Sequence, residues 1–202
     1  YNFKNLHKES DLFFDWYLKS IIGRKKSFKY KKIIKKELSV IYKKLYFKKY
    51  CLVHRDFHVS NIMLSKGKLA LIDTQDLIVG NRFYDLVSLL EDVRFKVPKK
   101  VKNQAIDFYL SKSSIKKKLF SKVKDDYDIL AVQRNLKILG IFFRLFKRDN
   151  KPLYLKYIPF TWKLIESSLR NKIFDNLRNK IDKAVKKNIR KKTKFKWKLK
   201  ML

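Results

Sequence analysis

Asp56, Asn61 and Asp73 are the residues of this chain whose types and spacing could do chemistry. Asp56 and Asn61 belong to the string HRDFHVSN at residues 54–61, and Asp73 follows Asn61 by twelve positions. Transfer of a phosphoryl group to an alcohol requires a carboxylate that accepts the hydroxyl proton, and oxygen ligands for a magnesium ion. The string also matches the loop pattern H-R-D-x-x-x-x-N of phosphoryl-transfer enzymes. The three residues therefore predict phosphoryl transfer.

Each of these three residues has an expected role in that chemistry. Asp56 would orient the acceptor hydroxyl and take its proton, so we predict that it is the catalytic base. Asn61 would offer a neutral oxygen to Mg²⁺, and Asp73 would offer the anionic ligand that bridges the metal to the phosphates. The expected cofactors are ATP and Mg²⁺.

Several polar residues near the loop have less specific roles. His54 and Arg55 are expected to shape the loop. Asp85 either caps the helix that it opens or braces the loop. His58 and Asp76 are candidates for contact with the substrate, although a packed, hydrogen-bonded imidazole is the favoured interpretation of His58.

Gln133 and Arg134 interrupt a long segment whose other residues are largely apolar. They are candidates for lining the acceptor site, together with Lys137. A solvent-facing side or a polar contact between helices explains them equally well.

Hydrophobic periodicity predicts a mostly helical α+β fold in which short strands carry the loop. Strands are expected at residues 51–53, 62–64 and 69–72, with a hairpin turn at residues 65–68 that contains Gly67. Helices are expected at about residues 8–22, 29–47, 82–92, from Pro98 onward, 125–147, 153–157 and 159–187. Ser10 or Asp11 is the expected cap of the first helix, and Gly23 its end.

The stretch from Cys51 to Arg94 resembles the aminoglycoside-phosphotransferase/choline-kinase-like superfamily. More narrowly, it is similar to the bacterial cell-wall-recycling kinases that phosphorylate the anomeric hydroxyl of N-acetylmuramate and N-acetylglucosamine. The segment AVQRNLKILGIF at residues 131–142, with Arg144 shortly after it, extends the narrower likeness. The resemblance covers about residues 1 to 170 and implies an amino sugar as the substrate.

The resemblance also implies which part of such a kinase this chain represents. A complete member would begin with a β-rich lobe that carries a phosphate-covering loop and a nucleotide-contacting lysine. The four glycines of this chain are scattered, so no glycine-rich phosphate loop is present. We expect residues 1–177 to form the carboxyl-terminal lobe of a protein-kinase-like fold, and residues 178–202 a basic, partly frayed extension. The missing N-terminal lobe is then an expected partner, and the chain alone is expected to be inactive.

The net charge of +34 suggests nucleic-acid binding, but the distribution of charge argues against it. Between Cys51 and Asp92, six acidic residues outnumber four basic ones, so the loop region is locally negative. Elsewhere lysine greatly outnumbers arginine, as a compositional bias would produce. The alternative from another functional class is a non-catalytic nucleic-acid-binding protein on a kinase-like scaffold.

Within the kinase class, aminoglycoside and choline or ethanolamine kinases are the alternatives to an amino-sugar kinase. A strongly basic chain would repel polycationic aminoglycosides at long range and attract a sugar that bears a carboxylate. The single cysteine, Cys51, excludes an internal disulfide and suits a reducing cytoplasm, which is the expected location. The most apolar stretch, residues 138–143, is too short to span a membrane.

Overall fold

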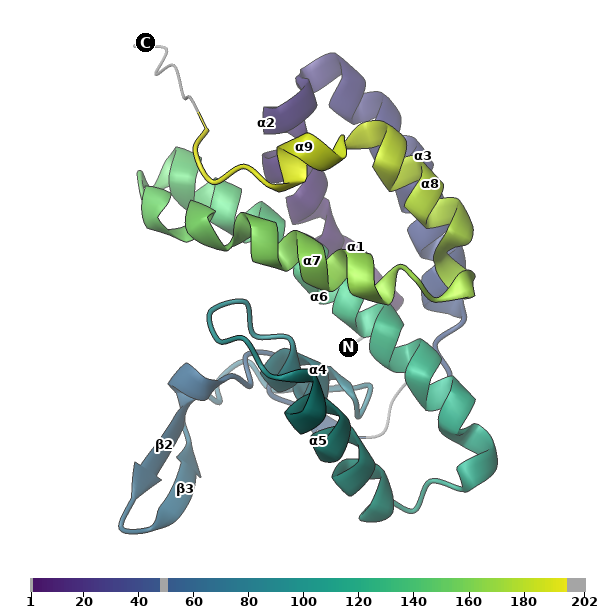
Figure 1. Ribbon diagram of the computed structural model, residues 1–202, viewed down its shortest axis with the longest axis vertical. Helices are drawn as coiled ribbons and strands as arrows, with labels where there is room; N and C mark the ends of the chain where they lie inside the picture. Colours follow the sequence, from purple (N-terminus) through teal and green to yellow (C-terminus); the bar gives the residue numbers. More distant parts are fainter. Residues whose placement is uncertain (1, 48–50, 196–202) are drawn as a thin grey trace.

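The long helix α6, Phe120–Arg148, runs through the middle of the molecule and separates two groups of elements (Figure 1). The computed structural model describes residues 2–47 and 51–195. Helices from both ends of the chain lie on one side of α6, and the strands lie with α4 and α5 on the other (Figure 1). The fold is mostly helical with small antiparallel sheets, as the sequence predicts.

The amino-terminal helical segment is longer than its sequence pattern indicates. It consists of α1, Phe3–Leu12, a π-helical turn, Phe13–Leu18, and α2, Lys19–Ile22. The expected caps are wrong: the side chain of Asn2 accepts the amide hydrogen bond of Asn5 at 3.0 Å, whereas Ser10 lies inside the helix and donates to the carbonyl of Leu6. Gly23, with a φ of +80°, ends this segment, and α3, Arg24–Lys43, folds back beside it.

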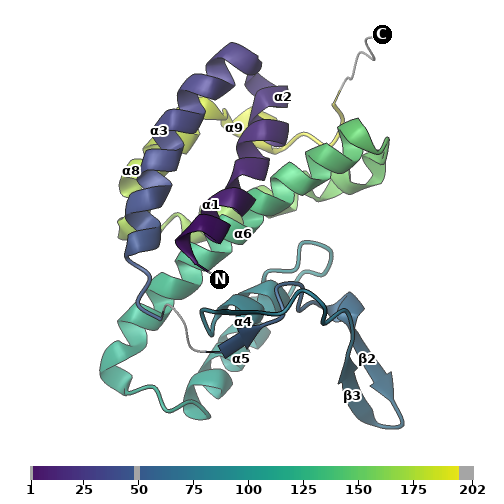
Figure 2. The same cartoon turned by 180° about the vertical axis from the view of Figure 1, so that it is seen from behind.

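Helix α1 packs closely along α6 (Figure 2), and a glycine makes this possible. A Cβ atom on Gly140 would lie 2.2 Å from the backbone carbon of Leu12 and 2.6 Å from the nitrogen of Phe13. Both distances are far below van der Waals contact, so a side chain there would push the two helices apart. The close approach places the polar residues of α1 opposite those of α6.

The carboxyl-terminal region contains two helices where the sequence predicts one. Helix α7, Ile158–Ser168, and α8, Asp175–Ala184, are separated by a bend and a 3₁₀ turn at Lys172–Phe174. The side chain of Asn171 causes the interruption, because its oxygen accepts from the amide of Ile173 and its nitrogen donates to Asp125 and Asp128. A further 3₁₀ segment, Pro152–Tyr157, precedes α7.

The sequence predicts a partly frayed extension from residue 178, but the structure has a helix there. Helix α8 continues through it, and α9, Lys187–Arg190, follows. Arg190 is buried, donates to Glu166 at 2.7 Å and Asp182 at 2.6 Å, and lies over the ring of Trp162. Residues 196–202 of the expected extension lie outside the described residues.

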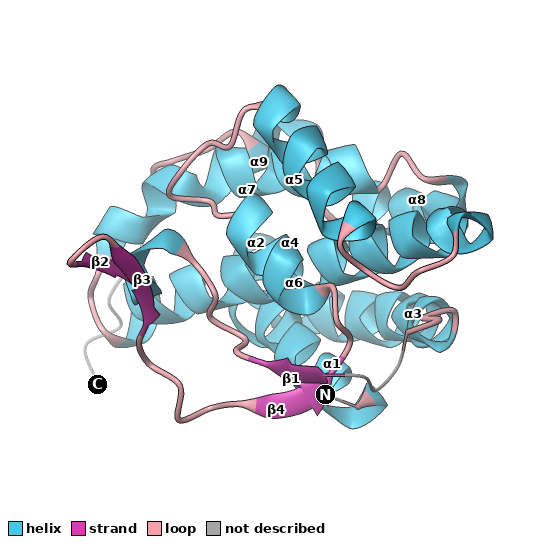
Figure 3. Cartoon of the chain, turned by 90° about the horizontal axis from the view of Figure 1, so that it is seen from below, coloured by secondary structure: helices cyan, strands magenta, loops and turns pink. Residues whose placement is uncertain are grey.

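The strands form two separate antiparallel pairs (Figure 3). Strand β1, Cys51–Val53, pairs with β4, Ile78–Gly80, and β2, Ile62–Ser65, pairs with β3, Lys68–Leu71. The hairpin turn of β2 and β3 contains Lys66 and Gly67, both with positive φ. The sequence pattern does not predict β4, because its pairing with β1 joins residues that are far apart in the chain.

Helix α4, Tyr84–Leu90, follows β4 and packs on α6. Pro98 precedes α5, Lys99–Ser111, as the sequence predicts, and a short 3₁₀ turn at Lys117–Leu119 leads into α6. The buried apolar side chains of both groups belong to one continuous core. No helix within residues 2–47 and 51–195 is long and apolar enough to cross a membrane.

Candidate functional site

The loop of residues 54–61 lies between β1 and β2, and it brings together the three residues that the sequence singles out. The side-chain nitrogen of Asn61 donates to the backbone oxygen of Asp56 at 2.9 Å and lies 3.5 Å from a carboxylate oxygen of Asp73. Residues 59–61 form a short 3₁₀ turn, Val59–Asn61, which starts β2. The side chain of Asn61 therefore lies between the backbone of Asp56 and the carboxylate of Asp73.

The position of Asp73 depends on a backbone that is tied to the loop. The amide of Ile72 donates to the carbonyl of Asn61 at 3.1 Å. The Nε2 atom of His54 lies 2.9 Å from the carbonyl of Ile72 and must donate to it, because a carbonyl oxygen only accepts. Asp73 itself has a φ of +65°, an uncommon conformation for a non-glycine residue. His54 is thus one of the residues that fix the chain leading into Asp73.

Asp85 holds the other side of the loop. Its carboxylate accepts from the backbone amides of His54 at 2.7 Å and Arg55 at 3.0 Å. Burial raises the pKa of Asp85, although these two hydrogen bonds oppose the shift. Arg55 has a φ of +73° immediately before Asp56, so the carboxylate supports a strained turn. Of the two roles left open by the sequence, this geometry matches bracing of the loop.

A buried aspartate on α6 holds α4 and its Asp85 in place. Asp126 is fully buried and accepts from the side chain of Asn81 at 2.7 Å and from the amides of Tyr46 and Phe47. The side-chain oxygen of Asn81 in turn accepts from the amide of Phe83, just before α4. A chain of hydrogen bonds therefore connects α6 to the start of α4.

Glu9 of α1 is the most heavily engaged acidic residue near the loop, and the sequence analysis missed it. It is 8% exposed, and its carboxylate accepts from Arg55 at 2.9 Å, from Lys137 at 3.1 Å and from Gln133 at 3.1 Å. Burial lowers the pKa of Lys137, but the nearby Tyr84, Glu9 and Asp56 outweigh that effect and the net shift is upward. Glu9 therefore joins α1, the loop and α6 around one buried carboxylate.

His58 lies near a second group of charged residues. Burial lowers the pKa of its imidazole, which is also within electrostatic range of Arg94, Asp92 and Arg134. The carboxylate of Asp92 accepts from Arg94 at 3.0 Å. The Nδ1 atom of His58 is buried and has no hydrogen-bond partner among the described residues. The imidazole is therefore packed, but it is not fully hydrogen-bonded.

The remaining candidate substrate contacts differ in their surroundings. Asp76 is exposed and only 3.9 Å from a guanidinium nitrogen of Arg55. Gln133 is completely buried and contacts Glu9, whereas Arg134 is 5% exposed and has a buried Nη1 atom without a partner in the described part of the chain. Gln133 thus makes a polar contact between helices, one of the two alternatives open from the sequence.

A cavity of about 490 Å³ opens beside Asp56. Its walls come from α1, the loop, β4 and α6: Asn5, Lys8, Glu9, Leu12, Arg55, Asp56, Ile78, Lys137, Ile141 and Arg144. This volume lies within the usual range for small-molecule sites. Asp56 can therefore reach a small molecule held there.

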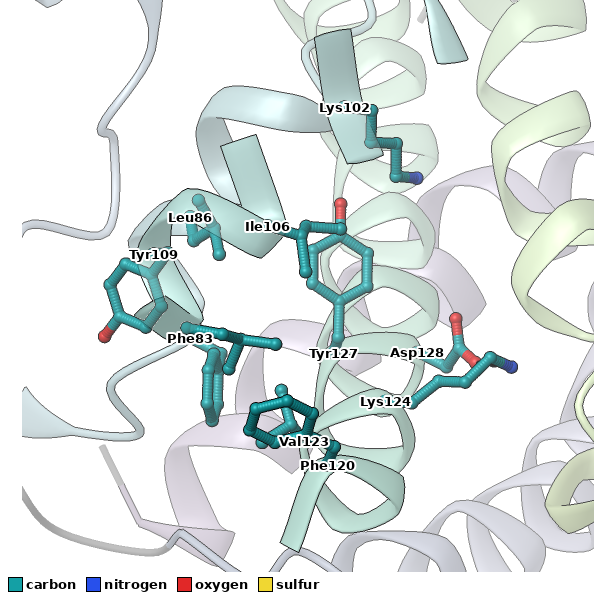
Figure 4. A pocket seen from close by; sticks show the side chains of 11 residues that line it. Phe83, Leu86, Lys102, Ile106, Tyr109, Phe120, Val123, Lys124, Tyr127 and Asp128 are labelled. Atoms are coloured by element: carbon teal, nitrogen blue, oxygen red, sulfur yellow. Dashed lines mark hydrogen bonds and ion pairs between the residues drawn. The ribbon is translucent and has the colours of Figure 1, made fainter. Parts of the chain in front are cut away.

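A second cavity, of about 290 Å³, lies between α4, α5 and α6 (Figure 4). Its lining is mostly apolar, including Phe83, Ile106 and Phe120, and among the described residues it includes none from the loop. The hydroxyl of Tyr127 and the amine of Lys102 at this cavity both bind the buried Glu91. The cavity beside Asp56 is therefore the one placed for phosphoryl-transfer chemistry.

The donor set at Asn61 and Asp73 fits a magnesium ion. The Nδ2 atom of Asn61 is used by the loop, which leaves its oxygen as a ligand, and the carboxylate of Asp73 is exposed. No cluster of three or more histidine, cysteine, aspartate or glutamate residues suited to a metal occurs in the described ranges. Magnesium does not require one, because it commonly takes one or two protein oxygens and completes its shell with phosphate oxygens and water.

Comparison with known proteins identifies the class. Residues 6–116 match the model of the phosphotransferase enzyme family, and this segment contains the loop, Asp73 and Asp85. The chain belongs to this family.

Individual relatives confirm the narrower resemblance as well. The chain is 31% identical over 163 residues to an N-acetylmuramate/N-acetylglucosamine kinase of Neisseria meningitidis, an alignment that covers 79% of this chain and 49% of that protein. It is 29% identical over 168 residues to the enzyme of the same name from Pseudomonas aeruginosa, covering 81% of this chain and 50% of that protein. The chain thus spans about half the length of the curated relatives it matches.

Proposed function

We propose that this protein transfers the terminal phosphoryl group of ATP to a hydroxyl of a small molecule, namely the anomeric hydroxyl of an amino sugar. The observation that carries the proposal is the convergence of Asp56, Asn61 and Asp73 next to a cavity of suitable size. The sugar class is supported by the names of the relatives, which are N-acetylmuramate/N-acetylglucosamine kinases.

Asp56 has the role of catalytic base in this proposal. Its carboxylate lines the cavity, where it accepts the proton of the acceptor hydroxyl as the oxygen attacks phosphorus. Asp85 and Glu9 act through the loop, because they bind the backbone and the guanidinium of the residue before Asp56. They are positioning residues.

Asn61 and Asp73 would hold Mg²⁺. When bound, the ion supplies positive charge that stabilises the phosphate oxygens during transfer. The hydrogen bonds from Asn61 to the backbone of Asp56 and from Gln75 to the carboxylate of Asp73, at 2.5 Å, orient these two side chains beforehand.

Residues 1–177 would then be the carboxyl-terminal lobe of a kinase-like fold, completed by an N-terminal lobe of the same protein. The support is an exposed apolar surface on the β2–β3 hairpin that leads to Asp73, where the paired residues Leu64 and Leu69 are 73% and 77% exposed. Apolar side chains on neighbouring strands are unfavourable in water. A second lobe and the nucleotide between the lobes would cover them.

The substrate class can be tested with the full-length protein encoded by the gene. The protein would be incubated with ATP and Mg²⁺ plus one acceptor at a time: N-acetylmuramate, N-acetylglucosamine, an aminoglycoside, or choline. We expect phosphorus NMR to show a sugar 1-phosphate with the two amino sugars. Phosphorylation of the aminoglycoside or choline alone would contradict the sugar assignment, and no transfer to any acceptor would contradict the proposed function.

A further inference from the structure

The cavity beside Asp56 has an excess of basic side chains. Four of its lining residues carry positive charge, namely Lys8, Arg55, Lys137 and Arg144, and two carry negative charge, Glu9 and Asp56. This excess contrasts with the local sequence around the loop, where acidic residues predominate. Three of the four basic residues, Lys8, Lys137 and Arg144, come from α1 and α6, which join the loop only in the folded chain.

The ion pairs of these residues show which of the basic side chains could bind a ligand. Glu9 is used internally, because Arg55 and Lys137 both donate to it at close range. Lys8 and Arg144 form no ion pair within the described ranges, and the buried Nε atom of Arg144 has no hydrogen-bond partner there. Asp149, the acidic residue nearest to Arg144 in sequence, is bound by Arg148 at 2.6 Å, and Arg144 acts on it more weakly, without an ion pair.

Arg144 has an unsatisfied buried N–H and lines a small-molecule cavity, so it is suited to a ligand that carries a carboxylate. Guanidinium groups bind carboxylates with two parallel hydrogen bonds, and they do so better than an ammonium group does. A buried donor without a partner is costly, and an anionic ligand group would satisfy it. Leu12 and Ile141 contribute apolar side chains to the lining of the same cavity.

We propose that the cavity accepts a sugar that carries a carboxylate, with Arg144 as the residue that recognises it and Lys8 adding positive charge at the rim. This inference rests on the proposed function, since the acceptor hydroxyl would lie at Asp56. Recognition of a carboxylate would distinguish N-acetylmuramate from N-acetylglucosamine, the two sugars in the names of the relatives. N-acetylmuramate is N-acetylglucosamine with an added lactyl ether, whose carboxylate is ionised at neutral pH.

The test compares these two sugars in full-length protein with and without the Arg144→Gln substitution. We expect kcat/KM for N-acetylmuramate to fall at least about 10-fold, the loss typical of a charge-assisted hydrogen bond, while the value for N-acetylglucosamine changes less than about 2-fold. Arg144→Lys should restore part of the loss. Arg148→Gln, one turn further along α6, is the matched control and should change neither value.

Equilibrium binding of each sugar, measured by calorimetry without ATP, separates this inference from the proposed function. Tighter binding of N-acetylmuramate that weakens in the Arg144→Gln variant supports the inference even if no phosphoryl transfer is found. Normal transfer to both sugars, with equal changes or no change on substitution, overturns the inference and leaves the kinase assignment intact. Failure of N-acetylmuramate to bind the wild-type protein also overturns it.

Discussion

The two ends of the candidate site, at Asp56 and at Asp73, are held in different ways. At the Asp56 end, acidic residues of three helices hold the loop. Glu9 on α1 binds the side chain of Arg55, and Asp85 on α4 binds its backbone amide. Asp126 on α6 supports the start of α4 through Asn81. At the other end, Asp73 lies next to a hairpin whose apolar side chains are exposed. The helices of this chain therefore hold the Asp56 side of the site, while the hairpin beside Asp73 is exposed. Substitutions at the Asp56 end should therefore lower the free energy of unfolding much more than substitutions at the Asp73 end.

The largest effect on folding is expected from Glu9→Ala. The substitution leaves the charges of Arg55 and Lys137 without their shared carboxylate, and breaking a buried ion pair from one side typically costs about 3–5 kcal/mol. Urea denaturation would measure the loss in the free energy of unfolding. Asp73→Asn, its counterpart at the exposed end, should stay within about 0.5 kcal/mol of the wild type. Equal losses of unfolding free energy in the two variants would contradict the proposed difference between the two ends of the site.

Gly140→Ala should produce the next largest effect. The added methyl group would overlap the backbone of Leu12, and overpacking of this kind typically costs about 1–3 kcal/mol. Because α1 and α6 form two walls of the cavity beside Asp56, sugar binding should weaken as well. Thermal unfolding and calorimetric titration would measure the two changes. A stable variant with unchanged binding would show that α1 can move without affecting the site.

The apolar hairpin should tolerate polar substitution when this chain is studied alone. Leu64→Ser and Leu69→Ser change exposed side chains, so we expect the free energy of unfolding to change by less than about 0.5 kcal/mol. In the full-length protein the same changes should weaken nucleotide binding, as measured by titration with an ATP analogue. Unaltered nucleotide binding would argue against a covering lobe on this face.

The smallest effect concerns His58. NMR titration of the chain should give an imidazole pKa below the ordinary value, because burial disfavours the charged ring. Asp92→Asn removes a nearby negative charge that favours the imidazolium, so the pKa should fall further. A normal or raised pKa in either protein would show that the imidazole is more solvated than the structure indicates.

Local signals in the sequence reveal the loop, its hairpin and most helices, because these depend on residues close together in the chain. The residues that support the loop are harder to predict. Glu9 lies among lysines in a segment that resembles a solvent-exposed helix, and its partners Arg55 and Lys137 are 46 and 128 positions away. The final helix was predicted as continuous because the apolar period persists across Asn171, whose capping contact depends on residues of α6.

Turnover by an Asp56→Asn variant of the full-length protein, with ATP and an amino sugar, tests the central claim most directly. The substitution preserves the size of the side chain but removes the proton acceptor, so kcat should fall at least about 100-fold with little change in stability. The exposed Asp107→Asn variant on α5 is the matched control and should retain wild-type turnover. Turnover close to that of the wild type in the Asp56→Asn variant would contradict the assignment of Asp56 as the catalytic base.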